Sequence, residues 1–200
     1  GGVQRFHEMF KPLLFDVLRI DSPDTYRLPT DVALPQGATQ YYLNQLESLL
    51  QQHHSTTAAM IIEPVVQGAA GMIMQPPRYL AGVRQLTQKY GVLLIADEVA
   101  VGFGRTGAMF ACDHENIRPD LMCLAKGLTG GYITMAATLA TTEIWNAFLG
   151  DPVRTFYHGH TYGGNPLAAA AAIANLEIFE SEQTMVNVHE RTAQLDNLLK

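Results

Sequence analysis

The sequence predicts an α/β fold in which helices flank a mostly parallel sheet. Three short apolar runs have the length and composition of buried strands: AAMII at 58–62, VLLIA at 92–96 and LMCLA at 121–125. A stretch with helical periodicity separates the first two runs, so that a strand, a crossover helix and a second strand follow one another. This order is typical of parallel sheets, whose strands are buried on both faces.

The helices are predicted from their apolar stripes and from residues that start and stop helices. From about Thr39 to Gln52, apolar side chains recur at helical spacing and form one face. The next helix lies within 76–91, where two prolines suit its start and a glycine suits its end. A fourth strand is predicted at 133–140, with its direction left open. A helix that begins at Pro166 follows it, with Asn165 as its N-cap.

Composition excludes several classes of function. The chain has 200 residues, of which 48% are hydrophobic and 16% charged, and its formal net charge is −6. Because no basic run is present, a nucleic-acid surface or an anionic-membrane anchor is not expected. No apolar stretch approaches the roughly 20 residues of a membrane span. The start has no signal peptide, and two widely spaced cysteines suit a reducing compartment, so a cytoplasmic location is expected.

Ionisable residues follow each of the three predicted strands. AAMII runs into Glu63, VLLIA runs into Asp97 and Glu98, and LMCLA runs into Lys126. If the strands are parallel, their carboxyl ends meet at one edge of the sheet, where ligands bind in folds of this class. This convergence is the main functional feature of the sequence.

Three glycines after the second strand have the spacing of a dinucleotide-binding turn, G-x-G-x-x-G. They are Gly102, Gly104 and Gly107. Such a turn needs its first glycine directly at the strand end and a helix that opens at the third. Here DEVAV intervenes, and the stretch after Gly107 is too interrupted for a full crossover helix. We therefore expect the glycines to shape an irregular loop beside the site.

Lys126 and Asp97 together suggest carbonyl chemistry. Among the four lysines, only Lys126 lies between an apolar strand and a glycine-rich turn. Burial disfavours the charged ammonium, and a neutral amine is a nucleophile that forms a Schiff base with an aldehyde. An acid on the neighbouring strand end suits the protonated nitrogen of a pyridine ring, the pairing known for pyridoxal phosphate (PLP). A buried Asp–Lys ion pair that serves structure alone remains an equal alternative on spacing.

At this point the chain resembles a known family. IIEPVVQGAAGM at 61–72, the stretch from LLIADEVAVGFGRTG to AKGLTGGY at 93–132, and FYHGHTYGGNPLAAAAA at 156–172 are similar, in order and spacing, to class III aminotransferases of PLP fold type I. The resemblance covers nearly the whole chain. RFHEMFKPLLF at 5–15 and the stretch 122–145 are most similar to the members that aminate 7-keto-8-aminopelargonate in biotin synthesis.

The resemblance implies a role for several residues. Lys126 would bind the cofactor pyridoxal 5'-phosphate covalently and move the proton, and Asp97 would bond the pyridine nitrogen. Val99 would pack on the ring, Gln67 would lie near its 3′ oxygen, and Glu63 would support Asp97. Thr161 would reach the cofactor phosphate of a partner subunit, and a homodimer with shared active sites is therefore expected. The residues assigned to the substrate are Tyr132, Gly159 and His160.

Each of these assignments has a purely structural alternative. Glu63 and Gln67 can simply join loops, Val99 and Tyr132 can be packed side chains, and Thr161 can bond its own turn. His158 and His160 alternate as two metal ligands on a strand would, but a zinc site needs three or four ligands, so no metal is expected.

The expected substrates are a small amino donor and a keto acceptor. His160 and Tyr162-Gly163-Gly164 stand where members that use S-adenosylmethionine carry Pro and Phe-Met-Gly. This departure leaves the donor open between S-adenosylmethionine and lysine. Another class III enzyme (an ω-aminotransferase or an aminomutase) and a non-catalytic cofactor-binding module remain the alternative functions.

Both ends of the chain are expected to be cut. The sequence lacks an initiator Met, and its last residues still have helical periodicity. We expect residues 1–180 to form the PLP-binding large domain without its N-terminal portion. Residues 181–200 would then begin the helix that leads to a C-terminal domain.

Overall fold

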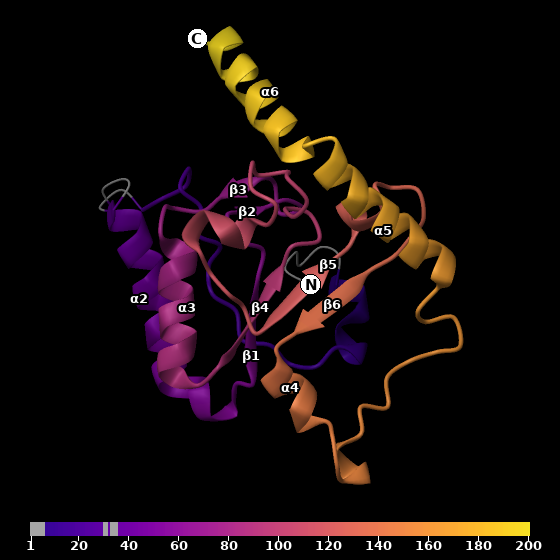
Figure 1. Ribbon diagram of the computed structural model, residues 1–200. Helices are drawn as coiled ribbons and strands as arrows, with labels where there is room; N and C mark the ends of the chain where they lie inside the picture. Colours follow the sequence, from indigo (N-terminus) through magenta and orange to yellow (C-terminus); the bar gives the residue numbers. More distant parts are fainter. Residues whose placement is uncertain (1–6, 30–31, 33–35) are drawn as a thin grey trace.

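A four-stranded sheet forms the centre of the computed structural model, which describes residues 7–29, 32 and 36–200 (Figure 1). Its strands are β1 (Ala59–Ile62), β4 (Leu93–Asp97), β5 (Leu121–Leu124) and β6 (Ala137–Ala140), in that spatial order. β4 pairs in parallel with both β1 and β5, whereas β6 is antiparallel to β5. The predicted α/β fold with a mostly parallel sheet is confirmed, and the direction of the fourth strand is now settled.

Two helices cover one face of the sheet. They are α2 (Gln36–His53) and α3 (Tyr79–Tyr90), which lie side by side and are coloured indigo to violet and magenta in Figure 1. Leu46 of α2, Val83 of α3 and Leu94 of β4 are almost completely buried in the main hydrophobic core. Each helix presents the apolar stripe that its sequence periodicity predicts.

The start of α3 differs from the sequence prediction. The helix begins at Tyr79, after the two prolines, and Arg78 at its N-cap has the left-handed φ of 63°. The carboxylate of Glu115 accepts the backbone N–H groups of Arg78 at 2.6 Å and Ala81 at 2.7 Å, so a residue distant in sequence caps the helix. Gly91 ends the helix in the left-handed conformation, as expected.

The opposite face of the sheet is partly open. Ile61 of β1 is 62% exposed and Leu93 of β4 is 38% exposed. The expectation that both faces of these strands are buried is therefore wrong for the described chain. The helices α2 and α3 cover only the face that carries Leu94 and Ala96.

After β6 the chain forms three helices: α4 (Thr142–Ala147), α5 (Pro166–Ser181) and α6 (Thr184–Leu198). Asn165 caps α5, because its side-chain Oδ1 accepts the backbone N–H groups of Leu167 at 3.0 Å and Ala168 at 3.5 Å. The predicted cap is confirmed. α6 extends from the end of α5 and carries the C-terminus away from the sheet (Figure 1).

Short elements connect this framework. β2 (Val66–Gln67) and β3 (Ile73–Met74) form a hairpin, and the 3₁₀ helices are Glu8–Leu13, His54–Thr56, Ala111–Glu115, Lys126–Thr129 and Pro152–Arg154. Residues 1–6, which include the first two residues of the 5–15 stretch, lie outside the described residues. Within the described part of the chain, no helix is long and apolar enough to cross a membrane.

Candidate active site

The carboxyl ends of β1, β4 and β5 lie at one edge of the sheet. In the parallel registers Ile62 is opposite Ala96 and Asp97 is opposite Cys123. Glu63 directly follows β1, Asp97 is the last residue of β4, and Lys126 comes two residues after β5. The predicted convergence of ionisable residues at one edge is confirmed.

Asp97 is half-buried and held by its own turn. Its Oδ1 accepts the backbone N–H of Val99 at 3.1 Å, which fixes the direction of the carboxylate. No described residue donates a hydrogen bond to Oδ2. Burial raises the pKa of the neighbouring Cys123 thiol, and the negative charge of Asp97 raises it further. Asp97 therefore presents a free carboxylate oxygen at the strand edge.

Lys126 begins the 3₁₀ turn Lys126–Thr129 and has a left-handed φ of 46°. Its side chain is exposed, and it forms no ion pair with any residue of 7–29, 32 or 36–200. The structural Asp–Lys ion pair is thus not formed in the described chain. Lys126 is exposed, so the burial expected for it from the sequence is not present either.

The loop after Asp97 is tied down by a buried acid. Glu98 is 0% exposed, and its two carboxylate oxygens accept the backbone N–H groups of Ala111 at 2.9 Å and Cys112 at 2.8 Å. Each oxygen thus has a partner, which a buried carboxylate requires. Burial strongly raises the pKa of the Cys112 thiol, with a further contribution from Glu98, so Cys112 is an unreactive core residue.

The three glycines serve this loop and not a dinucleotide. The backbone N–H of Gly102 donates to the carbonyl of Glu98 at 2.9 Å, and a Cβ on Gly102 would lie 2.9 Å from that carbonyl oxygen. Gly104 and Gly107 have φ of 85° and 93°. The stretch leads into the short 3₁₀ helix Ala111–Glu115, and a dinucleotide turn would need a long helix there.

Glu63 directly follows β1, and Gln67 is the last residue of the short strand β2. Oε2 of Glu63 accepts the backbone N–H of Gly68 at 2.9 Å, so this carboxylate shapes the turn that follows Gln67. A Cβ on Gly68 would lie 3.7 Å from the Cβ of Ala100, which places the turn beside the loop after Asp97. No hydrogen bond joins Glu63 to Asp97 within the described chain, so the support that Glu63 was expected to give Asp97 stays a prediction.

The remaining predicted residues are exposed. Tyr132 is 89% exposed and belongs to the lysine turn, because its backbone N–H donates to Thr129 at 3.2 Å. Gly159, His160 and Thr161 lie in an exposed connection before α5, where Nδ1 of His160 accepts the backbone N–H of Tyr162 at 3.1 Å. No contact joins these three residues to Asp97 or Lys126 within the described chain. Their assigned roles stay predictions.

No metal centre is formed by the residues that the structure describes, since no three or more of their His, Cys, Asp and Glu side chains are grouped to hold an ion.

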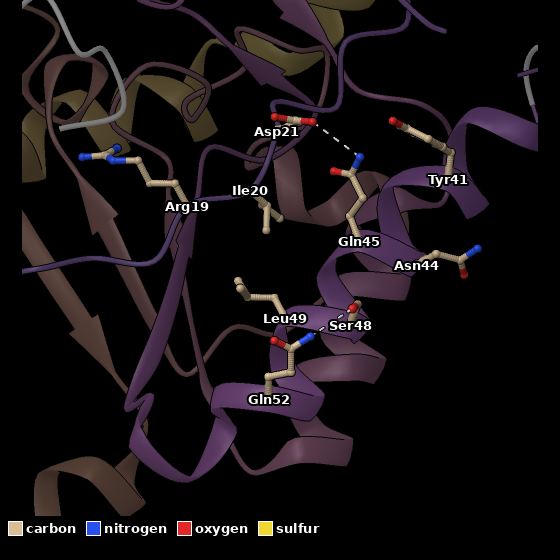
Figure 2. Close-up of a pocket in the computed structure, with 9 residues that line it drawn as sticks. All are labelled: Arg19, Ile20, Asp21, Tyr41, Asn44, Gln45, Ser48, Leu49 and Gln52. Atoms are coloured by element: carbon tan, nitrogen blue, oxygen red, sulfur yellow. Dashed lines mark hydrogen bonds between the residues drawn. The ribbon is translucent and has the colours of Figure 1, made fainter. Parts of the chain in front are cut away.

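A groove of about 560 Å³ lies away from the strand edge, between Arg19–Asp21 and α2 (Figure 2). Polar side chains such as Asn44 and Gln52 line it, and Nε2 of Gln45 donates to Asp21 across it at 3.4 Å. Because neither Asp97 nor Lys126 borders the groove, it is separate from the candidate site.

Sequence reasoning assigned Glu98 no role beyond its place at a strand end, and it assigned none to Glu115 or Asn175. Glu98 and Asn175 hold the segments that follow Asp97 and begin at Lys126, whereas Glu115 caps α3. Only Glu98 could be noticed in the sequence, because it is an acid that closely follows an apolar strand. The partners of the other two emerge only from the tertiary fold.

Comparison with known families gives one match over almost the entire chain. The model of the family described as aminotransferase class-III matches residues 2–200. Two similar curated proteins are both named adenosylmethionine-8-amino-7-oxononanoate aminotransferase. The one from Nitratidesulfovibrio vulgaris is 49% identical over all of this chain and 37% of its own length. The one from Geobacter sulfurreducens is 48% identical over all of this chain and 45% of its own length.

Comparison with solved structures also finds aminotransferases. The crystal structure of adenosylmethionine-8-amino-7-oxononanoate aminotransferase from Methanocaldococcus jannaschii superposes with a TM-score of 0.82 at 43% identity, over 94% of this chain and 41% of that one. A PLP-bound amine transaminase from an uncultivated Pseudomonas species gives 0.81 at 43% identity, over 88% and 40%. The chain thus spans less than half the length of these relatives.

Proposed function

We propose a function from one premise: the chain belongs to the aminotransferase class-III family. The whole protein is a PLP-dependent aminotransferase, and this chain supplies the part that holds the reactive end of the cofactor. The observation that carries the proposal is the placement of Asp97 and Lys126 at the carboxyl ends of two neighbouring parallel strands.

The residues at the strand edge fit the cofactor. Lys126 is exposed and forms no ion pair within the described chain, and Asp97 offers an acceptor oxygen, Oδ2, that no described residue occupies. A pyridine ring with an aldehyde and a protonated nitrogen needs one group of each kind. The PLP-bound form of the similar amine transaminase supports this assignment.

The cofactor, when bound, supplies an aldehyde that takes up amino groups and a ring that withdraws electrons from the substrate carbon. Lys126 would hold the cofactor covalently, and its amine, once free, would accept and return the proton that moves during amino transfer. The Asp97 carboxylate keeps a proton on the ring nitrogen, and the Val99 N–H keeps that carboxylate in place. Val99, Gln67 and Glu63 form the surrounding walls of the site.

The acceptor that we propose is 7-keto-8-aminopelargonate, which the reaction converts to 7,8-diaminopelargonate for biotin. The names of the curated relatives at 48–49% identity support it. The donor is S-adenosylmethionine or lysine, and His160 with Tyr162 favours lysine. Tyr132, Gly159 and His160 would line the substrate path.

The assembly proposed is a cytoplasmic homodimer. Thr161 lies in an exposed connection, which suits its predicted contact with the cofactor phosphate of a partner subunit. Residues 1–180 belong to the large cofactor domain in this proposal. Residues 181–200, most of which form α6, lead to a further domain that lies outside this chain.

An assay of the whole protein tests the proposal. Purified protein should show visible absorbance from the lysine-bound cofactor, and Lys126→Ala should lose it while keeping the thermal unfolding midpoint. The protein should then aminate 7-keto-8-aminopelargonate with one of the two donors. Preference for 4-aminobutyrate or ornithine would instead indicate another class III enzyme, and lysine-dependent colour without any transamination would indicate a non-catalytic module.

A further inference from the structure

Asn175 of α5 reaches the turn that begins with Lys126. Its Nδ2 donates to the backbone carbonyl of Gly127 at 2.8 Å and to that of Leu128 at 3.2 Å. Asn175 is half-buried, and its Oδ1 would lie 3.0 Å from a Cβ placed on Gly130. One side chain therefore bonds two residues of the Lys126–Thr129 turn and lies beside its C-cap, Gly130.

The turn needs such support because its first residue is strained. Lys126 has a φ of 46°, a left-handed conformation that residues with a side chain rarely adopt. Strained backbone persists only where the surrounding structure over-determines it. Within the turn, the N–H of Leu128 donates to Ala125 at 3.0 Å, and that of Gly130 donates to Gly127 at 3.2 Å. These bonds lie within the turn and do not join it to the rest of the fold.

Contacts from outside the turn also hold it. On one side Gly127 lies against Phe103, so closely that a Cβ on Gly127 would come within 2.7 Å of the Phe103 Cβ. On the other side Asn175 donates to two carbonyls of the turn, and at its end the Thr129 hydroxyl donates to the carbonyl of Ile133 at 2.6 Å. Because Phe103 is in the loop after Asp97 and Asn175 is in α5, the turn is fixed to both of its neighbours in the fold.

We propose that Asn175 is a positioning residue for Lys126, and this inference rests on the proposed function. By holding the Gly127 and Leu128 carbonyls, Asn175 fixes the direction in which the Lys126 side chain leaves the backbone. The amine is thereby aimed at the position that Asp97 also faces. Asn175 itself touches neither substrate nor cofactor.

The test uses two variants and one control in the whole protein. Asn175→Leu keeps much of the side-chain volume and removes the donor, whereas Asn175→Asp keeps the shape but sets carboxylate oxygens against two carbonyl oxygens. Glu177→Gln is the matched control, because Glu177 is exposed on the same helix. A thermal unfolding midpoint close to that of the parent shows which variants are folded.

The first measurement is amide hydrogen exchange of the protein without cofactor. We expect the Leu128 and Gly130 amides to exchange about tenfold faster in Asn175→Leu, as loss of one hydrogen bond implies. Amides in β1 and β4 should be unchanged. Because this experiment needs no activity, it tests the contact separately from the reaction.

The second measurement is kinetic and spectroscopic. Misplacement of the amine should lower kcat about tenfold or more, with KM changed less than about threefold. The pH midpoint of the visible absorbance should also shift in Asn175→Leu and more in Asn175→Asp. The inference about Asn175 would be overturned, with the proposed function intact, by one result. In that result a folded Asn175→Leu variant has the same kcat, the same pH midpoint of the visible absorbance and the same amide exchange rates as Glu177→Gln. A parent protein without lysine-dependent absorbance would overturn the proposed function and this inference with it.

Discussion

Asp97 of β4 is opposite Cys123 of β5 in the parallel register, and Lys126 follows Cys123 by three residues. Neighbouring strands of a sheet lie about 4.8 Å apart, so this register places an acid and an amine on adjacent strand ends. A shift of one residue would turn the Asp97 side chain to the other face of the sheet. The pairing of two strands thus determines whether the site exists.

Replacement of Asp97 tests its role in stabilising charge. We expect Asp97→Asn in the whole protein to keep the visible absorbance, because Lys126 is intact, and to lose about 10²–10³-fold in the rate of amino transfer. The neutral amide cannot hold a proton on the ring nitrogen as an anion does. Single-turnover absorbance changes with the amino donor measure this rate.

Asp196→Asn is the matched control, because Asp196 is an exposed residue of α6 that pairs only with Lys200 among the described residues. Near-normal amino transfer in Asp97→Asn would contradict the role given to Asp97.

Gly127 is expected to tolerate no side chain. A Cβ at this position would lie 2.7 Å from the Cβ and 2.9 Å from the Cδ2 of Phe103. Since the first of these atoms cannot move without its backbone, Gly127→Ala should lower the free energy of unfolding by about 1–3 kcal/mol. It should also weaken the visible absorbance, because the displaced turn carries Lys126.

Denaturant unfolding compares this variant with Gly159→Ala, whose new Cβ would meet nothing within 4 Å. Equal stability of the two variants would show that Phe103 does not fix the turn.

Glu98 is expected to stabilise the loop after Asp97. Its two oxygens each accept one backbone N–H, but a glutamine offers only one acceptor and turns an NH₂ group toward the other N–H. Glu98→Gln should therefore cost about 1–3 kcal/mol in the free energy of unfolding, as an unsatisfied buried donor does. Urea unfolding measures this cost.

The exposed Glu180→Gln on α5 is the control for the loss of one negative charge. If both variants unfold at the same urea concentration, the anchoring of Ala111 and Cys112 by Glu98 is not what holds the loop.

The sequence predicted the sheet and its reactive edge because these depend on local patterns. Apolar runs identify β1, β4 and β5, and the residue that ends each run is visible in the letters themselves. The anchoring of the site was not predictable in this way. Asn175 bonds Gly127 across 48 residues and Glu115 caps α3 across 37, and no local pattern specifies such partners.

The exposed face of the sheet shows a second limit. Ile61 and Leu93 have the apolar character of buried strand residues, yet they are exposed in the described chain. An apolar strand indicates that a face can be buried, whereas actual burial depends on which other elements pack against it.

Asp120 gives a prediction about pH. Its Oδ2 accepts Nη1 of Arg84 at 2.6 Å and the backbone N–H of Leu94 at 2.7 Å, and its Oδ1 accepts Nη2 of Arg84 at 3.1 Å. Partial burial raises the pKa of Asp120, but the bonds from Arg84 and Leu94 outweigh it, so the pKa lies below the ordinary value of 3.8. The unfolded chain therefore binds a proton more readily than the folded one.

It follows that Asp120 stabilises the fold fully above its unfolded pKa, and that this contribution is lost as pH falls below 3.8 through the folded value. We expect Asp120→Asn to unfold more easily than the parent by about 1–3 kcal/mol near neutral pH. The gap between them should be smaller at a pH below 3.8, because the carboxylate of the unfolded parent chain is protonated there before that of the folded one. Urea unfolding at both pH values measures the gap, with Asp196→Asn as the exposed control. A gap that stays constant or widens on acidification would mean that the Arg84–Asp120 pair does not supply this stability.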